Sequence, residues 1–287
     1  MFNFKRYSNV TKIVVPDKVQ WNTTSIANEF SGLLRLRTIQ SNLIGITNMW
    51  NAFAKCSNLT AAICGDNVQD MYNAYYYCTN LTKAACGNNV TDMRYAYCSC
   101  NKLTTAVSGP NVIDMRYTYR SCTNLTTAAC GDKVQLMTET YYGCTNLTTA
   151  VCGNNVANMY WTYRDCTSLT RAVCGNNVFN MSGAYRYCPN IQGNAYFYSP
   201  RIDDCSFCFA NRNTSNRLNI YVPENTTSNT SVHSIGTYSI VGNSITWDTD
   251  TANKCSYNTA YNIYIYPVAN VEKARLANGD PNNMGVK

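Results

Sequence analysis

Seven cysteines of this chain recur at a constant spacing of 22 residues, from Cys56 to Cys188. Methionine, leucine and aromatic residues recur at the same spacing, from Met49 to Met181, from Leu59 to Leu169 and from Phe53 to Tyr185. A constant period in the twenties is typical of solenoids, in which each repeat buries its apolar side against its neighbours. The period therefore predicts a stack of coils, an architecture used for binding more often than for catalysis.

One repeat, residues 59–80, predicts the structure of a coil. Residues 59–64 match the strand spacing of leucine-rich repeats, and Gly65 permits the turn that follows. Residues 68–78 place apolar residues three and four apart, the pattern of a helical face, and Asp70 can cap such a helix. We therefore predict an α/β repeat: a leucine-rich-repeat-like right-handed solenoid of 22-residue strand–turn–short-helix coils, with a small β C-terminal closing unit.

The period also predicts the organisation of the chain. We expect an N-terminal cap and a degenerate first coil over residues 1–45, with a strand at 11–16. The regular solenoid then covers residues 46–217. Residues 218–287 form a β-rich closing unit and a C-terminal tail, with strands at 218–223 and 261–267 and a hairpin at 239–247.

Composition excludes several classes of protein. The net charge of +7 is spread thinly over 287 residues without a block of Lys and Arg, so we expect no nucleic-acid partner. No run of 18 apolar residues occurs, so we expect no membrane insertion. The start of the sequence lacks the apolar core of a secretion signal, so we expect the chain to fold in a cytoplasm or to have lost its signal.

The sixteen cysteines are mostly a consequence of the repeat, and a cysteine that recurs with the period is most simply a small buried apolar residue. Whether any cysteines of adjacent coils form disulfides stays open. Cys205 and Cys208 have the spacing of metal ligands, but a zinc site needs a second pair, so we predict packing and no metal or cofactor. His233 is the single histidine, and no nucleophile is paired with it, so we predict no catalytic residues.

The repeat resembles the BspA-like leucine-rich repeats. The resemblance rests on the segments C-x-N-L-T-x-A and M-x-x-A-Y-x-x-C, seen for example at Cys78, Leu81 and Thr82, and covers roughly residues 20–223. It implies binding only: members are mostly surface adhesins of bacteria and mucosal protists, and related repeats occur in bacteriophage structural proteins. This chain departs from the family by placing Cys and Ala where other members have larger aliphatic residues.

Two surfaces are candidates for binding. Outward positions of the predicted helices carry Tyr, Trp and Arg, which dominate interface hot spots and can stack on sugars, although these rings can also simply cover neighbouring helices. This candidate binding surface comprises Tyr72, Tyr76, Arg94, Tyr95, Arg116, Tyr117, Arg120, Tyr160, Trp161, Arg164, Arg186 and Tyr187. Outward strand positions form a threonine row beside an apolar row, which indicates an assembly face or reflects β-propensity alone. This candidate assembly face comprises Thr60, Ile63, Thr82, Thr104, Val107, Thr126, Thr148, Val151, Thr170 and Val173.

These observations lead to two hypotheses for function. The first is a non-enzymatic bacteriophage structural protein of the tail or capsid surface that serves virion assembly, host-surface attachment, or both. Its partners would be other virion proteins or further copies of the chain, together with a glycan or protein of the host surface. The alternative is a bacterial or protist cell-surface adhesin of the BspA-like type.

Overall fold

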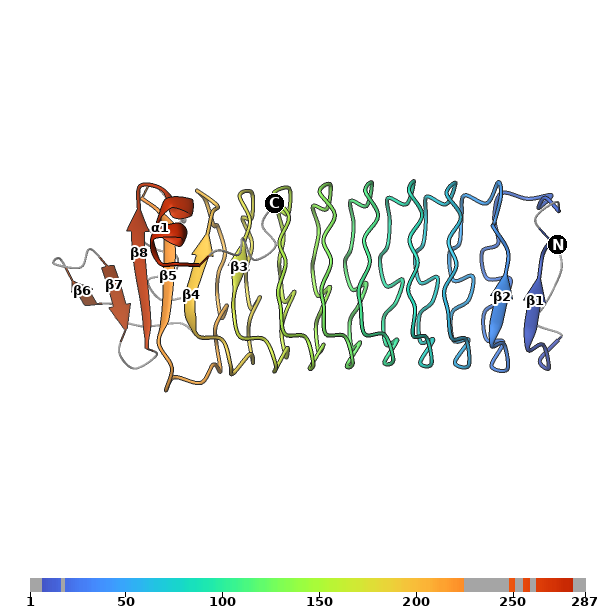
Figure 1. Ribbon diagram of the computed structural model, residues 1–287, viewed down its shortest axis with the longest axis horizontal. Coiled ribbons are helices and arrows are strands. Elements are labelled where there is room, and N and C mark those ends of the chain that lie inside the picture. The colour runs from blue at the N-terminus through green and yellow to red at the C-terminus, as the bar shows by residue number, and fades with distance from the viewer. Residues whose placement is uncertain (1–6, 17–18, 225–247, 251–254, 259–261, 281–287) are drawn as a thin grey trace. The chain divides into compact units, whose positions relative to one another are not determined.

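The computed structural model describes residues 7–16, 19–224, 248–250, 255–258 and 262–280. The chain divides into two compact units. The first unit comprises Met1–Val134 and Thr140–Leu147, and the second comprises Gln135–Glu139 and Thr148–Lys287. Within each unit the chain runs as successive coils, as Figure 1 shows. The boundaries at residues 45 and 217 that we expect from the sequence stay a prediction.

The first unit opens with a pair of parallel strands, β1 (Lys12–Val14) and β2 (Thr38–Gln40), which confirms the predicted strand at 11–16. In the coils that follow, parallel pairing is reduced to single bridges, such as Ala61 to Lys83 and Thr105 to Thr127. A second line of parallel bridges, through Asn48, Asp70, Asp92 and Asp114, joins the same coils at the start of their other side.

The second unit holds a six-stranded sheet. Its strand order is β3-β4-β5-β8-β7-β6, parallel from β3 to β8 and antiparallel beyond. The strands are β3 (Val173–Cys174), β4 (Gly193–Phe197), β5 (Leu218–Pro223), β6 (Asp248–Asp250), β7 (Cys255–Asn258) and β8 (Ile263–Val268). The predicted strands at 218–223 and 261–267 therefore exist, while the predicted hairpin at 239–247 lies outside the described residues.

Helix α1 (Val271–Ala277) follows β8 and was not expected from the sequence, which predicted a C-terminal tail without a helix. Asn270 caps it by accepting a hydrogen bond from the Lys273 amide. The helix packs near β4 and β5, where Glu272 accepts a hydrogen bond from the Tyr198 hydroxyl and pairs with Arg275. Within the described part of the chain α1 is the sole helix, and its seven residues fall well short of the roughly 20 that cross a bilayer.

The short helix predicted in each coil is wrong for every coil that the structure describes. The amides of Met71, Asn73 and Tyr75 donate to carbonyl groups of the next coil, at distances of 2.8 to 3.0 Å, instead of to carbonyl groups four residues back. Asn73 and Tyr77 also have positive φ angles, of 54° and 59°, which a right-handed helix does not contain. This side of the coil is therefore a chain of turns held by bonds between coils.

The predicted helix cap is accordingly a turn. The Asp70 side chain accepts a hydrogen bond from the amide two residues later, at 2.7 Å, and Asp92, Asp114 and Asn158 repeat this contact in their own coils. Such a bond is the signature of an Asx turn. The period therefore predicted correctly that Asp70 bonds the backbone at this position, but the bond begins a turn and not a helix.

The predicted strands are also shorter than expected, and a buried tyrosine explains why. In the coil of residues 59–80 the hydroxyl of Tyr75 accepts from the Ile63 amide at 3.0 Å and donates to the Ile63 carbonyl at 2.5 Å. These backbone groups would otherwise continue the strand ladder into a neighbouring coil. The longer strand β4 ends at Phe197, 12 residues before Phe209, which has no hydroxyl to compete.

Candidate functional site

The interior of each unit is built on the 22-residue aromatic column, here called the inner aromatic column. Its rings are fully buried and lie nearly parallel, with centroids 5.3 to 5.7 Å apart between successive members. Each tyrosine hydroxyl in it bonds both the amide and the carbonyl of one residue in its own strand segment, as Tyr119 does with Val107. The members are Phe53, Tyr75, Tyr97, Tyr119 and Tyr141 in the first unit, and Tyr163 and Tyr185 in the second.

Burial makes these hydroxyls poor acids. It raises the pKa of Tyr75, Tyr97, Tyr119 and Tyr185 well above its ordinary value, because a phenolate would have no water around it. The two backbone hydrogen bonds of each hydroxyl are therefore made by the neutral phenol. The column is structural and offers nothing to a ligand.

The seven cysteines from Cys56 to Cys188, here called the thiol column, occupy one position of successive coils, and thiols within each unit bond the preceding coil. The Cys100 thiol donates to the Tyr75 carbonyl at 3.1 Å, and Cys78, Cys122 and Cys144 make the same contact in their own coils. All seven are buried thiols. Burial raises the pKa of Cys56 to about 12, so the thiol column consists of weak hydrogen-bond donors with little nucleophilic character.

The turn side of the first unit brings most of the candidate binding surface together. Tyr95 stacks on Tyr117 with centroids 4.4 Å apart and meets Tyr72 edge-on at 5.9 Å. The Arg94 guanidinium lies over the Tyr72 ring at 5.1 Å and pairs with Asp92 at 2.6 Å. These half-exposed side chains form one continuous aromatic and charged patch.

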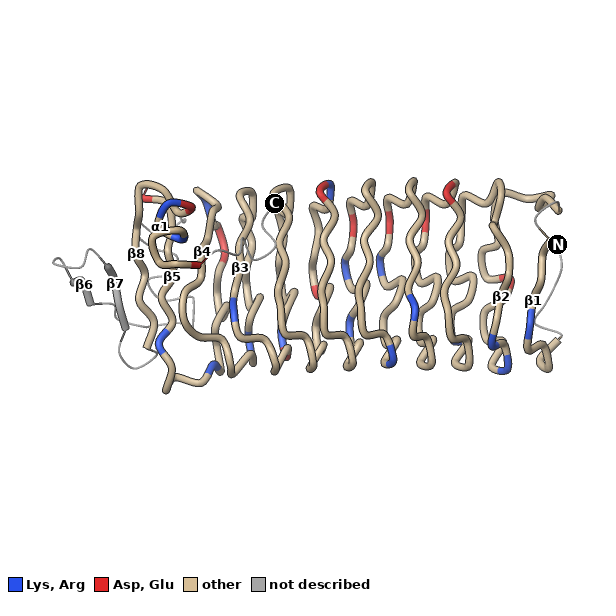
Figure 2. The backbone as a smooth tube through the Cα atoms, in the orientation of Figure 1, with Lys and Arg blue, Asp and Glu red and all other residues tan. Residues whose placement is uncertain are grey.

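Further members of this surface lie beside the patch on the same coils. Arg116 pairs with Asp114 at 2.6 Å, and Arg120 lies 4.3 Å from the ring of Tyr142. The ring of Tyr76 meets Tyr77 edge-on at 4.6 Å, next to a hollow of about 410 Å³. Figure 2 shows that charged residues are thinly scattered over the coils, so the aspartates beside Arg94 and Arg116 are local partners.

The turn side of the second unit carries a separate cluster around Trp161. Tyr160 stacks on Trp161 at 4.8 Å, and the Arg164 guanidinium lies 4.3 Å from the indole centroid. Arg186 lies over the rings of Tyr187 and Phe207, at 5.0 and 5.4 Å. The cluster combines aromatic faces with guanidinium groups, as the patch of the first unit does.

Several of these exposed aromatic residues have a backbone conformation that is rare for large side chains. Tyr95, Tyr117, Trp161 and Tyr187 have φ angles between 53° and 61°. Gly183, at the position one coil after Trp161, also has a positive φ, and a side chain there would meet the indole ring at 2.5 Å. Absence of a side chain at residue 183 therefore makes room for the ring of Trp161.

The candidate assembly face is only partly exposed. The threonines at 60, 82, 104, 126, 148 and 170 are exposed, and the hydroxyls of Thr82 and Thr126 each bond the carbonyl of the preceding threonine at 3.0 Å. Ile63, Val107 and Val151 are half-buried. Val173 is buried, so it adds nothing to an exposed row.

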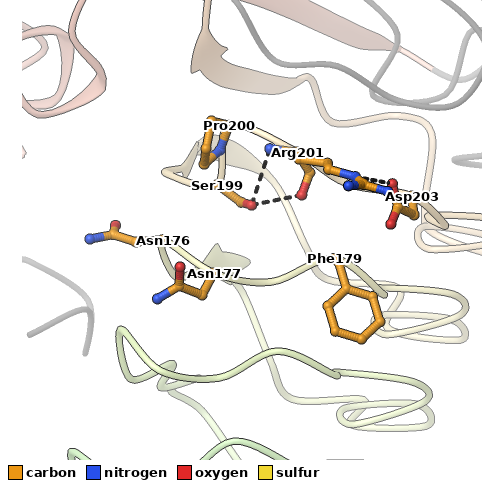
Figure 3. A pocket seen from close by; sticks show the side chains of 7 residues that line it. All are labelled: Asn176, Asn177, Phe179, Ser199, Pro200, Arg201 and Asp203. Carbon is orange, nitrogen blue, oxygen red and sulfur yellow. Dashed lines mark hydrogen bonds and ion pairs between the residues drawn. The ribbon is translucent and has the colours of Figure 1, made fainter.

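The sequence did not reveal a hollow of about 360 Å³ in the second unit, drawn in Figure 3. Phe179, Asn176 and Asn177 line it from one coil, and Arg201 and Asp203 line it from the next. The available signal was Phe179, the only aromatic residue in a column that holds Gln69, Thr91, Ile113, Gln135 and Ala157 in the preceding coils. Trp50, Tyr77 and Phe207 were also missed, although the period places them beside predicted residues.

Metal chemistry has no support in the described residues, where no group of three or more His, Cys, Asp or Glu side chains is arranged to hold an ion. Cys205 and Cys208 are buried thiols, and burial raises the pKa of Cys208 well above its ordinary value. Cys98 is buried as well, with its pKa raised by the same cause. His233, the single histidine, lies outside the described residues.

The family model for the BspA type leucine-rich repeat region matches residues 1–126 and 94–214 in six copies. The chain therefore belongs to the BspA-type leucine-rich repeat family and has a leucine-rich repeat fold, in agreement with the resemblance of its repeat. This family is a scaffold for protein–protein interaction and is generally non-enzymatic.

Three solved structures that are similar to this chain are leucine-rich proteins. A leucine-rich cell surface protein from Faecalibacterium prausnitzii A2-165 is 13% identical, with 96% of this chain and 92% of that chain covered and a TM-score of 0.49. A leucine-rich repeat protein from Bacteroides ovatus ATCC 8483 is 13% identical, with 76% and 70% covered and a TM-score of 0.41. The T. pallidum leucine-rich repeat protein is 14% identical, with 71% and 77% covered and a TM-score of 0.40. No curated protein matches the sequence.

Proposed function

We propose that this chain is a non-enzymatic repeat protein of a bacteriophage virion, in the tail or on the capsid surface, where it mediates assembly, host-surface attachment, or both. The thiol column is the observation that carries the proposal. Its cysteines are buried as thiols, and each of Cys78, Cys100, Cys122 and Cys144 donates to a backbone carbonyl at 3.1 Å.

A stack of this kind favours folding where thiols stay reduced. Cysteines that recur in neighbouring coils are exposed together in the unfolded chain, and an oxidising compartment would cross-link them in wrong pairs. A cytoplasm keeps them reduced until the coils bury them. A virion component is made in the host cytoplasm and still reaches the outside, so the reduced interior and an extracellular binding role are compatible in it.

The binding role would belong to the candidate binding surface. Tyr, Trp and Arg are the side chains that contribute most to interface hot spots. Here Arg94 is held in place by Asp92 and by the ring of Tyr72, and Arg164 by the ring of Trp161. Side chains that are already ordered lose less entropy when a partner arrives. The exposed threonine row with Ile63, Val107 and Val151 is the proposed face for contacts with other virion proteins or further copies of the chain.

The alternative proposal is a bacterial or protist cell-surface adhesin, the role that the resemblance to the BspA-like repeats implies. It uses the same binding surface and differs in the particle that carries the chain. In that case the thiol column would have to be buried during or after export.

Mass photometry of the native material that contains this chain, with its proteins identified by peptide sequencing, separates the two proposals. A megadalton particle that also contains capsid and tail proteins supports the virion proposal. Recovery as a free monomer, or from cell envelopes without phage proteins, rules it out and leaves the adhesin.

The role of the surface needs a second measurement on purified chain. We expect the double variant Tyr95→Ser/Tyr117→Ser to lose binding to intact bacterial cells that bind the unaltered chain, and Thr105→Ser/Thr127→Ser on the strand side to retain it. Equal binding by both variants would remove the turn side from the proposal.

A further inference from the structure

The hollow beside Phe179 has features that the regular coils lack. The Phe179 side chain is 43% exposed, although a phenyl ring gains by burial. The corresponding residue is polar or small in most other coils, for example Gln69, Thr91 and Ala157. The facing wall departs from the repeat as well, because Ser199-Pro200-Arg201 replaces the usual Gly-Asn-Asn segment.

Backbone bonds hold the two walls at a constant separation. The amides of Asp203 and Asp204 donate to the Phe179 carbonyl at 2.7 and 3.1 Å, and the Phe179 amide donates to the Ala157 carbonyl at 3.0 Å. The Ser199 hydroxyl, which is almost fully buried, donates to the Arg201 carbonyl at 2.8 Å and stabilises the turn. A ligand would therefore meet a preformed site, which reduces the entropy lost on binding.

The polar groups around the ring include both donors and acceptors of hydrogen bonds. Arg201 donates to Asp203 through Nε at 2.6 Å, and its guanidinium keeps further N–H groups that point away from that bond. Asn177 uses one amide N–H to reach the Asn154 carbonyl at 2.7 Å and keeps its side-chain oxygen as an acceptor. Asn176 is exposed and adds a second amide at the rim, as Figure 3 shows.

The charges of the site cancel. Arg201 and Asp203 form an ion pair at 2.6 Å, so neither an anion nor a cation finds an uncompensated opposite charge. The remaining requirement is a ligand with an apolar face for Phe179 and with several groups that donate and accept hydrogen bonds. A pyranose ring meets it, since one face presents C–H groups and its edge carries hydroxyls. The hollow, of about 360 Å³, has room for one or two such rings.

We propose that the hollow formed by Phe179, Asn176, Asn177, Arg201 and Asp203 binds a neutral saccharide, with one sugar ring against the phenyl face. The ion pair and the two amides bond the sugar hydroxyls. This site differs from the candidate binding surface, and the proposal holds for a virion protein and for a cellular adhesin alike.

The test uses the full chain on an array of neutral and anionic glycans, followed by saturation-transfer NMR with lactose, maltose and diacetylchitobiose. We expect binding to at least one neutral glycan, with an affinity that changes little on adding salt, because no net charge is involved. Sulfate should not compete. If no neutral glycan binds the folded chain, the proposal is wrong.

Variants decide whether the bound sugar lies in this hollow. Phe179→Ala should weaken binding by roughly tenfold or more, which corresponds to about 1.4 kcal/mol of lost ring contact. Ile113→Ala changes the corresponding position of an earlier coil and should leave the affinity unaltered. Asp203→Asn should weaken neutral glycans and introduce competition by sulfate, because Arg201 then lacks its partner. Unchanged affinity in both Phe179→Ala and Asp203→Asn would place the sugar elsewhere.

The outcome is independent of the particle that carries the chain. If the glycan tests fail, the saccharide proposal is wrong, and the virion proposal is still decided by the mass of the native particle. If the chain is a monomer that binds glycans, only the virion proposal is wrong.

Discussion

Tyrosines recur every 22 residues both in the inner aromatic column and among the outward residues of the turn side. They are buried in the first set and half-exposed in the second. Tyr119 is fully buried, lies in a parallel stack and places its hydroxyl on the Val107 backbone. Tyr117, two residues earlier, is half-exposed and stacks on Tyr95. A shift of two residues therefore separates a side chain that holds coils together from one that is available to a partner.

The backbone explains how such a small shift has this effect. Amides on the turn side donate alternately to the next coil and to the carbonyl three residues back, as in Tyr97 and Cys98. Tyr117 lies in the corresponding segment of the next coil, where its φ angle is 61° and its side chain is half-exposed. An α-helix would also separate two such residues, by about 200°, but here the separation comes from the alternating hydrogen bonds and the positive φ angle.

Removing a ring from the inner aromatic column should have the largest effect. We expect Tyr119→Ala to lower the free energy of unfolding by about 3–5 kcal/mol, because it leaves a cavity between Tyr97 and Tyr141. Tyr117→Ala removes a ring of the same size from the surface and should lower it by about 1 kcal/mol. Urea unfolding followed by circular dichroism measures both, and comparable losses would contradict the division into inner and outer residues.

Removing only the hydroxyl should cost less. In Tyr119→Phe the ring stack remains, but the amide and carbonyl of Val107 lose their partner, which we expect to lower the free energy of unfolding by about 1–3 kcal/mol. Hydrogen exchange should show faster exchange at the Val107 amide than in the unaltered chain. An amide that stays protected would mean that the strand ladder closes by itself, as it does in β4, which ends 12 residues before Phe209.

The columns themselves could be predicted from the sequence, and the conformation of the turn side could not. The spacing of Val68, Met71, Ala74, Tyr75 and Cys78 fits a helical face, and each of these residues is buried as that face requires. The same spacing also suits successive turns in which every third or fourth residue points inward. What decides is the set of bonds between coils, such as Met71 amide to Asp92 carbonyl, and those have no local signal.

The candidate binding surface was predictable as a list of outward positions, because position in the repeat determines which residues face out. The pairing of its members was not, since Arg94 over Tyr72 depends on where adjacent coils lie. The hollow at Phe179 escaped for a different reason. It forms where the sequence departs from the repeat, at Phe179 and at Ser199-Pro200-Arg201, and the 22-residue period cannot predict such a departure.

Alkaline pH should act on the thiol column in a defined direction. Burial raises the pKa of Cys56 from 9.0 to about 12. Below pH 9 the native and unfolded thiols are both protonated, and the stability is fully present. Between pH 9 and about 12 the unfolded thiol loses its proton while the native one keeps it, so stability falls by about 1.4 kcal/mol per pH unit for each such thiol.

Urea unfolding at several pH values between 8 and 11, with a reducing agent present, measures this slope. Cys56→Val removes one titrating thiol and should make the slope less steep. Tyr117→Ser on the surface is the matched control and should leave the thiol contribution as it is. A stability that rises over this range would contradict burial of the thiol column.

The smallest expected effect, and the only gain, concerns the positive φ angles. Ser121 has a φ of 60°, and Gly143 occupies the corresponding position of the next coil with a φ of 72°. Glycine adopts this conformation without the roughly 1–2 kcal/mol that other residues lose, but it is more flexible in the unfolded chain, so we expect Ser121→Gly to raise the free energy of unfolding by about 0.5–1 kcal/mol. The reverse change at a surface ring position, Gly183→Ala, should lower it and shift the fluorescence of Trp161, because the added methyl group meets the indole. If Ser121→Gly lowers the free energy of unfolding, the serine side chain stabilises the chain by more than its backbone conformation costs.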